Sequence, residues 1–349
     1  MYTPKYSITN KILRNIGIVE ACREVVDNAP LVPAYEKRFR EEAIVRTVHY
    51  GTHIEGNELN LTEAEQVIKG NHVEARDRDI QEVLNYRNVL FYLDNIDRGE
   101  ETGGKITEEV IKKIHSLTVE KIMPSEQSGT YRKTQVVVKN SLTGEITFRP
   151  PAAIEVPYLM ADFVEWINKN KSEELHPVLK AGITHYELVR IHPFLDGNGR
   201  MARSVATLIL FLDKYDIKKF FSLEEYFDRD AAHYYESLRS AAEGELTGWL
   251  EYFTQGLAIE LTRIKEKVQR LSTDLHLKEK LGGKQVFLSE RQIAIMEYIQ
   301  RVGYLSNQGF IDLFPKISED TILRDLHDLM QKGIIKKEGR TKASRYLLR

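Results

Sequence analysis

Cysteine is almost absent from this chain, and other features common in specialised proteins are missing too. The 349 residues include one cysteine, Cys22, which excludes an intramolecular disulfide and a cysteine-based zinc site. The longest apolar run, at 205–212, is far too short to span a bilayer. The first residues lack a basic region followed by an apolar run, so no signal peptide is indicated. We therefore expect a cytoplasmic protein in a reducing compartment.

A large excess of one charge sign is also lacking. The formal net charge is -2 at pH 7, so no global field favours nucleic acid or a membrane surface. The contents of 42% hydrophobic and 29% charged residues are ordinary for a globular protein. The length predicts one large domain with a smaller one, or two of medium size.

Helical periodicity dominates roughly the first 260 residues, so we expect a mainly α protein. In the stretch 79–93 the apolar residues recur at helical spacing and predict one buried face: Ile80, Val83, Leu84, Leu90 and Phe91. Thr62 and Glu65 have the spacing of a capping box for a short helix that stops at Gly70.

One segment breaks the helical pattern. Residues 128–151 contain a β-branched run, turn residues at 140–144, a second short β run and two prolines. This order predicts a β-hairpin at 130–148. The exposed edges of such a hairpin could hold an extended peptide by strand addition, and a plain surface hairpin is an equal alternative.

The last third of the chain has its own pattern. Residues 257–284 predict a charged linker helix that ends at a pair of glycines. Beyond it, residues 285–349 read as three helices, the middle one at 306–314, followed by two short strands. That order is typical of a small winged helix-turn-helix (α+β) domain.

The stretch HPFLDGNGRMAR, residues 192–203, lies between two apolar helical runs and carries more chemistry than a helix connection needs. His192 could accept a hydroxyl proton near neutral pH. Asp196 could hold Mg²⁺ beside phosphate groups. A zinc site is excluded, because these two residues give at most two ligands and no HExxH is present.

The same stretch also favours an anion. Gly197, Asn198 and Gly199 can adopt backbone conformations closed to most residues and can form an anion-binding turn at a helix N-terminus. Arg200 and Arg203 are three residues apart, share a helix face and suit a polyphosphate. Each residue alone is usually structural, but the complete set at fixed spacing favours a nucleotide site.

These residues resemble the signature of the Fic family, His-Pro-Phe-x-Asp/Glu-Gly-Asn-Gly-Arg-x-x-Arg, at every fixed position. The resemblance covers about residues 1–265. It implies a helical Fic core at 101–265, with the hairpin at 130–148 as a flap. It also implies an activity, the transfer of AMP from ATP to a Ser, Thr or Tyr hydroxyl of a target protein.

The resemblance implies a role for each residue. His192 would be the general base, and Asp196 would hold Mg²⁺ on the phosphates. The nucleotide would be bound by Gly197, Asn198, Gly199, Arg200 and Arg203, with Asn198 on the α-phosphate. The target segment would lie along the flap residues Thr130, Tyr131, Arg132, Val136, Val137 and Val138. Tyr234 or Tyr235 would lie against the adenine.

A second match lies in the N-terminal helical region, 1–100, at the end of a helix expected at about 33–56. Residues 54–57 fit the inhibitory pattern Ser/Thr-x-x-x-Glu-Gly/Asn of the family, which implies that Glu55 pairs with Arg203 and blocks the ATP γ-phosphate. The Ser/Thr position is Gly51 here, and Thr52 lies one residue later. In some relatives the same Glu helps to remove AMP.

The C-terminal domain leaves two readings open. Residues 316–349 contain nine Lys/Arg and five Asp/Glu, an excess of four positive charges. Candidate DNA contacts at the start of the third helix and in the wing are Ser318, Thr321, Arg324, Lys342 and Arg345. Aspartates on the same helix, Asp320, Asp325 and Asp328, count against tight phosphate contact, and a protein-binding role is equally open.

The sequence thus predicts an ATP- and Mg²⁺-dependent protein adenylyltransferase that is auto-inhibited by Glu55. One alternative is a nucleotide-sensing, DNA-binding transcription regulator. Others are a de-AMPylase that uses the same site and a transferase with a different nucleotide donor. The target protein is unknown, a homodimer stays open, and no membrane partner is expected.

Overall fold

The computed structural model describes residues 2–29, 31, 33–99, 105–139, 146–169, 174–241, 244–271, 288–306, 309–310, 313–315, 317–339 and 344–349. Within them the fold is mainly helical, as predicted. The chain divides into two compact units, Met1–Asp27 with Arg40–Lys265 and Asn28–Phe39 with Glu266–Arg349. The domain boundaries assigned from the sequence remain predictions.

Helices make up nearly all regular structure before residue 272. The α-helices are α1 (Asn10–Asp27), α2 (Pro33–His53), α3 (Leu61–Ile68), α4 (Asp77–Asp97), α5 (Glu108–Thr118), α6 (Val156–Lys169), α7 (Pro177–Ile191), α8 (Asn198–Leu212), α9 (Leu223–Arg229), α10 (Ala231–Ser240) and α11 (Thr247–Leu271). The described residues also form two short 3₁₀ turns, η2 (Ala153–Glu155) and η3 (Ile217–Lys219).

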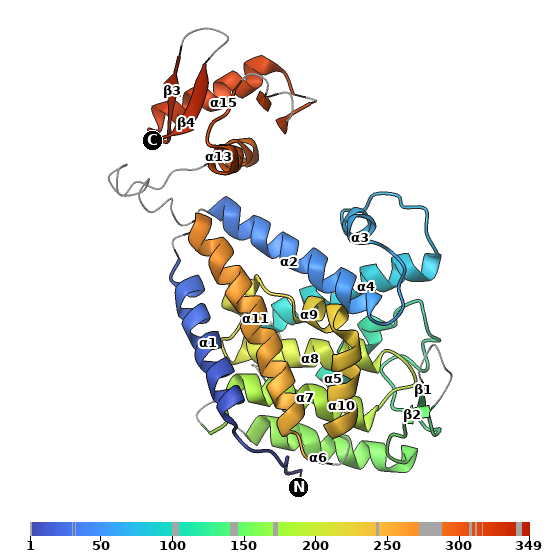
Figure 1. The fold of residues 1–349 in the computed structure, drawn as a ribbon. Coiled ribbons are helices and arrows are strands. Elements are labelled where there is room, and N and C mark those ends of the chain that lie inside the picture. Colours follow the sequence, from blue (N-terminus) through green and yellow to red (C-terminus); the bar gives the residue numbers. More distant parts are fainter. Residues whose placement is uncertain are drawn as a thin grey trace. The chain divides into compact units, whose positions relative to one another are not determined.

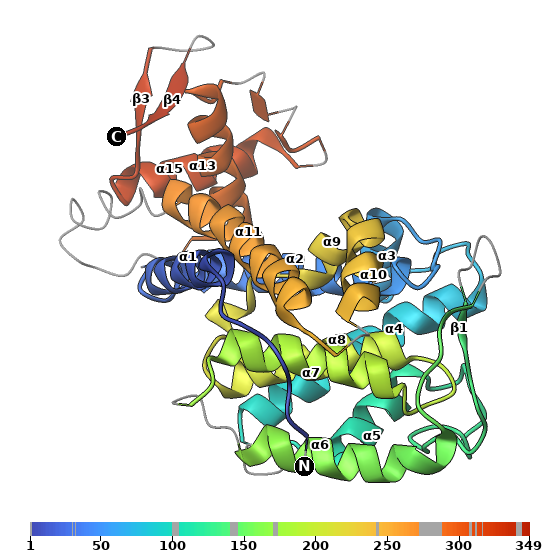
Figure 2. The same cartoon turned by 60° about the horizontal axis from the view of Figure 1, so that its bottom comes forward.

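The centre of the larger unit is the pair α7 and α8, joined by the loop at 192–197 (Figures 1 and 2). Both helices are buried along most of their length. In Figure 2 α5 and α6 lie below this pair, and α9, α10 and α11 lie above it. The loop is therefore held by a rigid, fully packed helical pair, which suits a site that must keep its geometry.

The buried face of α4 differs from the predicted one. Phe91, expected inside, is 51% exposed, and the inward face includes the polar residues Asp79, Glu82 and Asn85. These polar groups have partners: Asn85 Nδ2 donates to the carbonyl oxygens of Thr118 at 3.2 Å and Glu120 at 2.8 Å. A pattern of apolar residues alone cannot find a face that buries satisfied polar groups.

The cap of α3 was also misplaced by two residues. Asn60, and not Thr62, is the N-cap, because its side-chain oxygen accepts from the backbone N–H groups of Thr62 and Glu63, both at 3.0 Å. Glu63 completes the capping box by accepting from the Asn60 N–H at 2.9 Å. Asn caps a helix as well as Thr does, and here it stands earlier in the chain.

The predicted hairpin is present as two short antiparallel strands, β1 (Val138–Lys139) and β2 (Ile146–Phe148), at the edge of the unit (Figure 1). Val138 pairs with Phe148 and Lys139 with Ile146, with an irregularity between them. The predicted turn at 140–144 lies outside the described residues. Among the described residues β1 has no further strand on its outer edge.

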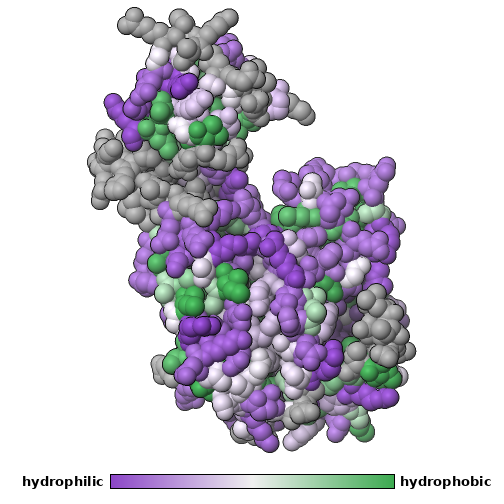
Figure 3. Space-filling view, in the orientation of Figure 1, coloured by the Kyte–Doolittle hydropathy of each residue, from purple (hydrophilic) through white to green (hydrophobic). Residues whose placement is uncertain are grey.

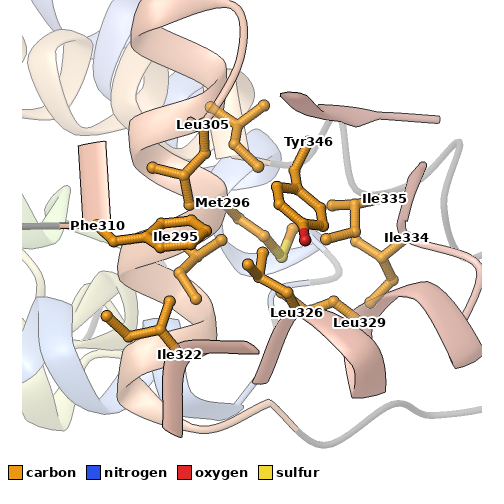
Figure 4. Close-up of a cluster of buried hydrophobic side chains, with 11 residues drawn as sticks. Ile295, Met296, Leu305, Phe310, Ile322, Leu326, Leu329, Ile334, Ile335 and Tyr346 are labelled. Carbon is orange, nitrogen blue, oxygen red and sulfur yellow. The ribbon is translucent and has the colours of Figure 1, made fainter. Parts of the chain in front are cut away.

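The smaller unit has the predicted winged-helix elements. Its described elements include the helices α13 (Glu290–Val302) and α15 (Glu319–Gln331) and the wing strands β3 (Ile335–Glu338) and β4 (Arg345–Leu348). Apolar side chains from all four elements meet in one cluster, with Tyr346 beside Met296 and Leu326 (Figure 4). The predicted middle helix at 306–314 falls partly outside the described residues, and so do residues 272–284 of the predicted linker helix.

Apolar side chains on the face in Figure 3 form small groups between hydrophilic ones. Within the described part of the chain, no helix combines the length and the apolar character that a membrane crossing requires.

Candidate active site

The loop between α7 and α8 needs special backbone geometry at both ends. His192 ends α7 in the left-handed region, at φ 51° and ψ 59°, and its N–H donates to the Leu188 carbonyl at 3.0 Å. Gly197 precedes α8 at φ 75°, and a Cβ atom there would lie 2.9 Å from a methyl carbon of Val119. A glycine is therefore required at 197, both for its backbone angle and for its close approach to α5.

His192 has the protonation pattern of a base. Its Nδ1 lies 3.3 Å from the Val189 carbonyl oxygen. Because a carbonyl only accepts, Nδ1 carries the proton and Nε2 keeps its lone pair. Burial lowers the pKa of His192 below its ordinary value, so the neutral imidazole dominates near pH 7.

Arg132 differs from the expectation that it contacts a target. Its side chain is 3% exposed, with Nε donating to the His192 carbonyl at 2.8 Å and Nη2 to the Pro151 carbonyl at 2.6 Å. Its N–H donates to the Pro193 carbonyl at 2.9 Å. Arg132 is thus a buried cation at the carboxyl end of α7, where it holds the turn that carries His192.

Asp196 is the one loop carboxylate. Its side chain is 50% exposed, Oδ1 accepts from the Gly197 N–H at 2.7 Å, and Oδ2 lies 3.4 Å from Nη2 of Arg78. Within the described residues no cluster of three His, Cys, Asp or Glu side chains could hold a metal by itself. A single carboxylate still suits Mg²⁺, which often takes its other ligands from substrate phosphates and water.

The side chain of Asn198 is fully used inside the loop. Its Oδ1 accepts from the Phe194 N–H and its Nδ2 donates to the Phe194 carbonyl, both at 2.9 Å. Asn198 is 2% exposed. The predicted contact with an α-phosphate would therefore have to come from its backbone N–H at the start of α8, since the amide closes the turn.

Arg200 is buried against a carboxylate that the sequence analysis missed. Its Nη1 lies 3.3 Å from Oε1 of Glu82, and the two side chains are 3% and 6% exposed. Nε and Nη1 of Arg200 nevertheless have no hydrogen-bond partner in the described part of the chain. A buried guanidinium with unused donors fits an anion that is still to bind.

Arg203 is held by the turn after α2. Its Nη2 donates to Oε1 of Glu55 and to the carbonyl of Gly51, both at 2.9 Å. The Arg203 side chain is 1% exposed and the Glu55 side chain 30%. Burial alone would lower the pKa of Arg203, but the Glu55 carboxylate raises it well above its ordinary value. The predicted contact between these residues, 148 positions apart, is therefore formed.

The Glu55 carboxylate also lies directly on the glycine turn. A Cβ atom on Gly199 would be 2.3 Å from Oε1 of Glu55 and 3.2 Å from Nη1 of Arg203. Gly199 belongs to the first turn of α8, whose free N–H groups and dipole attract anions. The carboxylate thus occupies a position with the properties of an anion site.

The inhibitory pattern has Ser or Thr at the position of Gly51, and the packing around Gly51 explains the difference. A Cβ atom there would lie 2.3 Å from Cε1 of Tyr86, which is fully buried. The neighbouring Thr52 turns its hydroxyl back to the carbonyls of Val48 and His49, at 2.9 and 3.0 Å. The close approach of α4 therefore excludes a larger residue at 51 while the turn still presents Glu55.

The two tyrosines suggested for adenine have different surroundings. Tyr234 is 1% exposed, and its hydroxyl lies 3.1 Å from Nε2 of His185 in an aromatic core. Tyr235 is 45% exposed, and its hydroxyl donates to the Ile54 carbonyl at 3.2 Å. Tyr234 is therefore a core residue, whereas Tyr235 contacts the turn that carries Glu55.

The remaining flap residues divide in the same way. Tyr131 donates its hydroxyl to Glu108 at 2.8 Å and packs on Phe194, so it anchors the flap to α5 and to the loop. Thr130 is exposed, and Val136 to Val138 are partly exposed ahead of and within β1. Thr130 and the valine segment are thus the parts of the predicted flap that stay accessible.

The sequence analysis also missed His115, which lies directly under the loop. It is fully buried, its Nε2 is 2.9 Å from the Asp196 carbonyl, and its Nδ1 accepts from the Gly129 N–H at 3.0 Å. Its ring stacks on Phe194 at a centroid distance of 3.7 Å. Burial lowers the pKa of His115 to about 4. The sequence did hold a signal for this residue, because His115 shares the buried side of its helix with the apolar residues Val110, Ile111 and Ile114.

In the smaller unit, the predicted DNA contacts Ser318 and Arg324 are exposed at the start of α15, and Thr321 is partly exposed beside them. Arg345 is exposed on β4, and Lys342 lies outside the described residues. Two of the three aspartates are neutralised: Asp325 pairs with Arg291 at 2.7 Å, and Asp328 pairs with Lys332 and accepts from Gln292.

Comparison with known proteins shows which families two parts of this chain match. Residues 105–210 match the Fic/DOC family, and residues 291–342 match the DeoR-like helix-turn-helix domain. The chain therefore contains a Fic/DOC domain, followed by a helix-turn-helix domain of the DeoR type.

Its relatives agree with this assignment. The chain is 30% identical over 226 residues to the Protein adenylyltransferase Fic of Nematostella vectensis. The aligned residues are 62% of this chain and 47% of that protein. It is 28% identical over 219 residues to the protein of the same name from Drosophila grimshawi, covering 62% and 42%. The chain thus spans less than half of the length of these curated relatives.

A solved structure resembles the whole chain. It is a Fic family protein from Desulfovibrio desulfuricans G20, with a TM-score of 0.68 and 25% identity, and the match covers 100% of this chain and 98% of that one. The fold also resembles Fic-1 (aa134 - 508) from C. elegans, with a TM-score of 0.59 and 24% identity over 76% of this chain and 73% of that one.

Proposed function

We propose that this chain is an ATP-dependent protein adenylyltransferase whose site is the loop between α7 and α8. The names of its relatives and the match to the Fic/DOC family support the reaction class. The observation that carries the proposal is the Glu55 carboxylate, which lies on Gly199 and binds Arg203. A side-chain anion stands where a phosphate would find a glycine turn, a helix N-terminus and a guanidinium.

In this proposal each of the chain's own residues has one task in the reaction. His192 takes the proton of a target hydroxyl at Nε2 while that oxygen forms a bond to the α-phosphorus. The bond from the α-phosphorus to the bridging oxygen breaks, and pyrophosphate leaves with its electron pair. Arg200 and Arg203 stabilise the negative charge on the β- and γ-phosphates, so positioning and charge supply most of the catalysis.

Asp196 would hold Mg²⁺, which supplies positive charge to the phosphates when it is bound. The Asp196 carboxylate faces Arg78, whose side chain is 62% exposed and can turn away from Asp196 while its Nε still binds Glu82. Val136 to Val138, on the accessible part of the flap, would align the target segment by main-chain hydrogen bonds.

Glu55 holds the site inactive in this proposal. Its carboxylate takes a donor of Arg203 and places negative charge beside Gly199, where an incoming phosphate would be repelled. Because Glu55 stands on a turn and is 30% exposed, it can move away without opening the helical core.

The test compares the wild type with Glu55→Gly, using α-labelled ATP and Mg²⁺. Glu55→Gly should raise labelling of protein about tenfold or more, since one charged contact that blocks the phosphate is removed. Glu58→Gly, an exposed glutamate of the same segment, is the matched control and should match the wild type. Adding His192→Ala to Glu55→Gly should reduce labelling about a hundredfold.

Two outcomes would reject the proposal. Glu55→Gly without any labelling would reject the transferase, and undiminished labelling after loss of His192 would reject the role of the base. Parallel reactions with α-labelled GTP, CTP and UTP identify the donor. Release of AMP from a modified protein, faster with Glu55 than without it, would favour the de-AMPylase reading instead.

A second function, DNA binding by the smaller unit, is favoured by the pairing of Asp325 and Asp328 with basic side chains. Their charges no longer oppose a phosphate backbone beside the exposed Arg324. Duplex binding by the full chain, followed by fluorescence anisotropy across a salt series, should weaken as salt rises. Arg324→Ala should weaken it further, and absence of salt-dependent binding would remove this function.

A further inference from the structure

His115 contacts both the flap start and the loop of the proposed site from one buried position on α5. Its Nδ1 accepts from the N–H of Gly129, where the chain turns into the flap. Its Nε2 lies 2.9 Å from the carbonyl oxygen of Asp196. An N–H can only donate and a carbonyl can only accept, so the ring is neutral with its proton on Nε2. One tautomer satisfies both contacts at once.

Both contacts lie at places where the backbone has little freedom. Gly129 has a φ of +67°, and a Cβ atom there would lie 3.0 Å from the Lys112 carbonyl on α5. The Asp196 carbonyl precedes Gly197, whose N–H binds the Asp196 carboxylate. The ring itself stacks on Phe194, inclined by 7°. The imidazole therefore connects the flap start, the loop backbone and the loop's aromatic anchor.

We propose that His115 is a positioning residue, which sets the register between the flap start at Gly129 and the loop carbonyl of Asp196. The inference rests on the proposed function, because it gives the flap the target and Asp196 the metal. His115 touches neither the nucleotide nor the reacting atoms. A residue that only fills space would need neither of the two nitrogens, and that difference is testable.

Three substitutions separate the two contacts. His115→Phe keeps an aromatic ring on Phe194 and loses both hydrogen bonds. His115→Asn places an amide oxygen near the position of Nδ1 and can still accept from Gly129. His115→Gln places an amide N–H₂ near the position of Nε2 and can still donate to Asp196. Ile114→Val, which removes one methyl from the same buried face of α5, controls for a general loss of packing.

The first readout needs no nucleotide. The Gly129 amide hydrogen should exchange with deuterated water about tenfold faster in His115→Phe than in the wild type, because its acceptor is gone. His115→Asn should restore the protection, and Ile114→Val should keep it. Unchanged protection in His115→Phe would overturn the contact with the flap, whatever the chain's activity proves to be.

The second readout uses the Glu55→Gly background and α-labelled ATP. His115→Phe should lower kcat about tenfold or more, as loss of a residue that orients a ligand usually does, and should raise the Mg²⁺ concentration for half-maximal rate. His115→Gln should recover the Mg²⁺ midpoint, and His115→Asn the KM for the target. Kinetics of His115→Phe equal to those of its Glu55→Gly parent would overturn the inference. Absence of transfer in that parent would reject the function itself, and the exchange data would still decide the flap contact.

Discussion

Two carboxylates face the two arginines of the loop, and they do so from opposite kinds of structure. Glu55 stands on a turn after α2, is 30% exposed and accepts a hydrogen bond from Arg203 at 2.9 Å. Glu82 stands on the inner face of α4, is 6% exposed and lies 3.3 Å from Arg200 without a hydrogen bond between them. The two carboxylates thus carry the same charge, but Glu55 is partly exposed on a turn and Glu82 is buried on a helix.

The difference separates a displaceable anion from a fixed counter-charge. Glu82 is tied by Asn57, which donates to its Oε2 at 3.0 Å, and by Arg78, which donates to its Oε1 at 3.1 Å. It balances the buried Arg200 and leaves donors of that guanidinium unused. Glu55 has a single ion-pair partner among the described residues and takes a donor that a phosphate would use. A regulated site needs both a displaceable anion and a fixed counter-charge.

The largest predicted effect is on stability. Glu82→Ala should lower the free energy of unfolding by about 3–5 kcal/mol, because it leaves Arg200 buried without its counter-charge. Glu55→Ala should lower it by about 1 kcal/mol or less, since water can reach Arg203 once the turn moves. Urea unfolding of both variants measures the contrast. Equal losses would remove the distinction between the two carboxylates.

The sequence found the residues of the loop because they are contiguous, and their chemistry can be read at fixed spacing. It found the contact from Glu55 to Arg203 through the resemblance alone, since no local pattern joins positions 148 apart. It missed Glu82 and His115, which reach the site from other helices. Each is a polar residue on a buried helix face, and the packing of α4 and α5 against α8 brings it there.

The second prediction concerns Gly51, which lets the turn approach α4. Gly51→Ala puts a methyl group against Tyr86, whose hydroxyl is held by Glu224 at 3.0 Å, so the ring cannot swing away. Overpacking should lower the free energy of unfolding by about 1–3 kcal/mol and displace Glu55 from Arg203. Urea unfolding and ATP labelling should therefore show lower stability together with higher transfer.

A control and a rescue accompany this change. Gly17→Ala, where an added Cβ meets nothing within 4 Å, should be neutral or slightly stabilising. Tyr86→Leu should relieve the clash in Gly51→Ala and restore inhibition. Loss of stability in Gly51→Ala without any rise in labelling would show that the end of α2 does not control the position of Glu55.

The third prediction is a pair of double-mutant cycles on ATP binding, measured by calorimetry. Glu55→Gln should tighten binding only while Arg203 is present, with a coupling of about 1 kcal/mol between the two changes. The parallel cycle of Glu55→Gln with Arg200→Gln should give a coupling within about 0.3 kcal/mol, because Glu82 faces Arg200. Equal couplings would mean that Glu55 acts through the general field of the loop.

The smallest effect is on the pH dependence of transfer in the Glu55→Gly variant. The base must be unprotonated, and burial holds the pKa of His192 below its ordinary value, so kcat/KM should fall at a lower pH than an ordinary histidine base would give. The Glu55 carboxylate opposes that shift, so its removal should move the acid limb further down than in the wild type's residual activity. The charges that act most on this pKa are those of Glu55, Arg132 and Asp196, so adding Glu82→Gln should leave the limb where it is. If the acid limb shifted on substitution of Glu82 and stayed unchanged on substitution of Glu55, the roles assigned to the two carboxylates would be reversed.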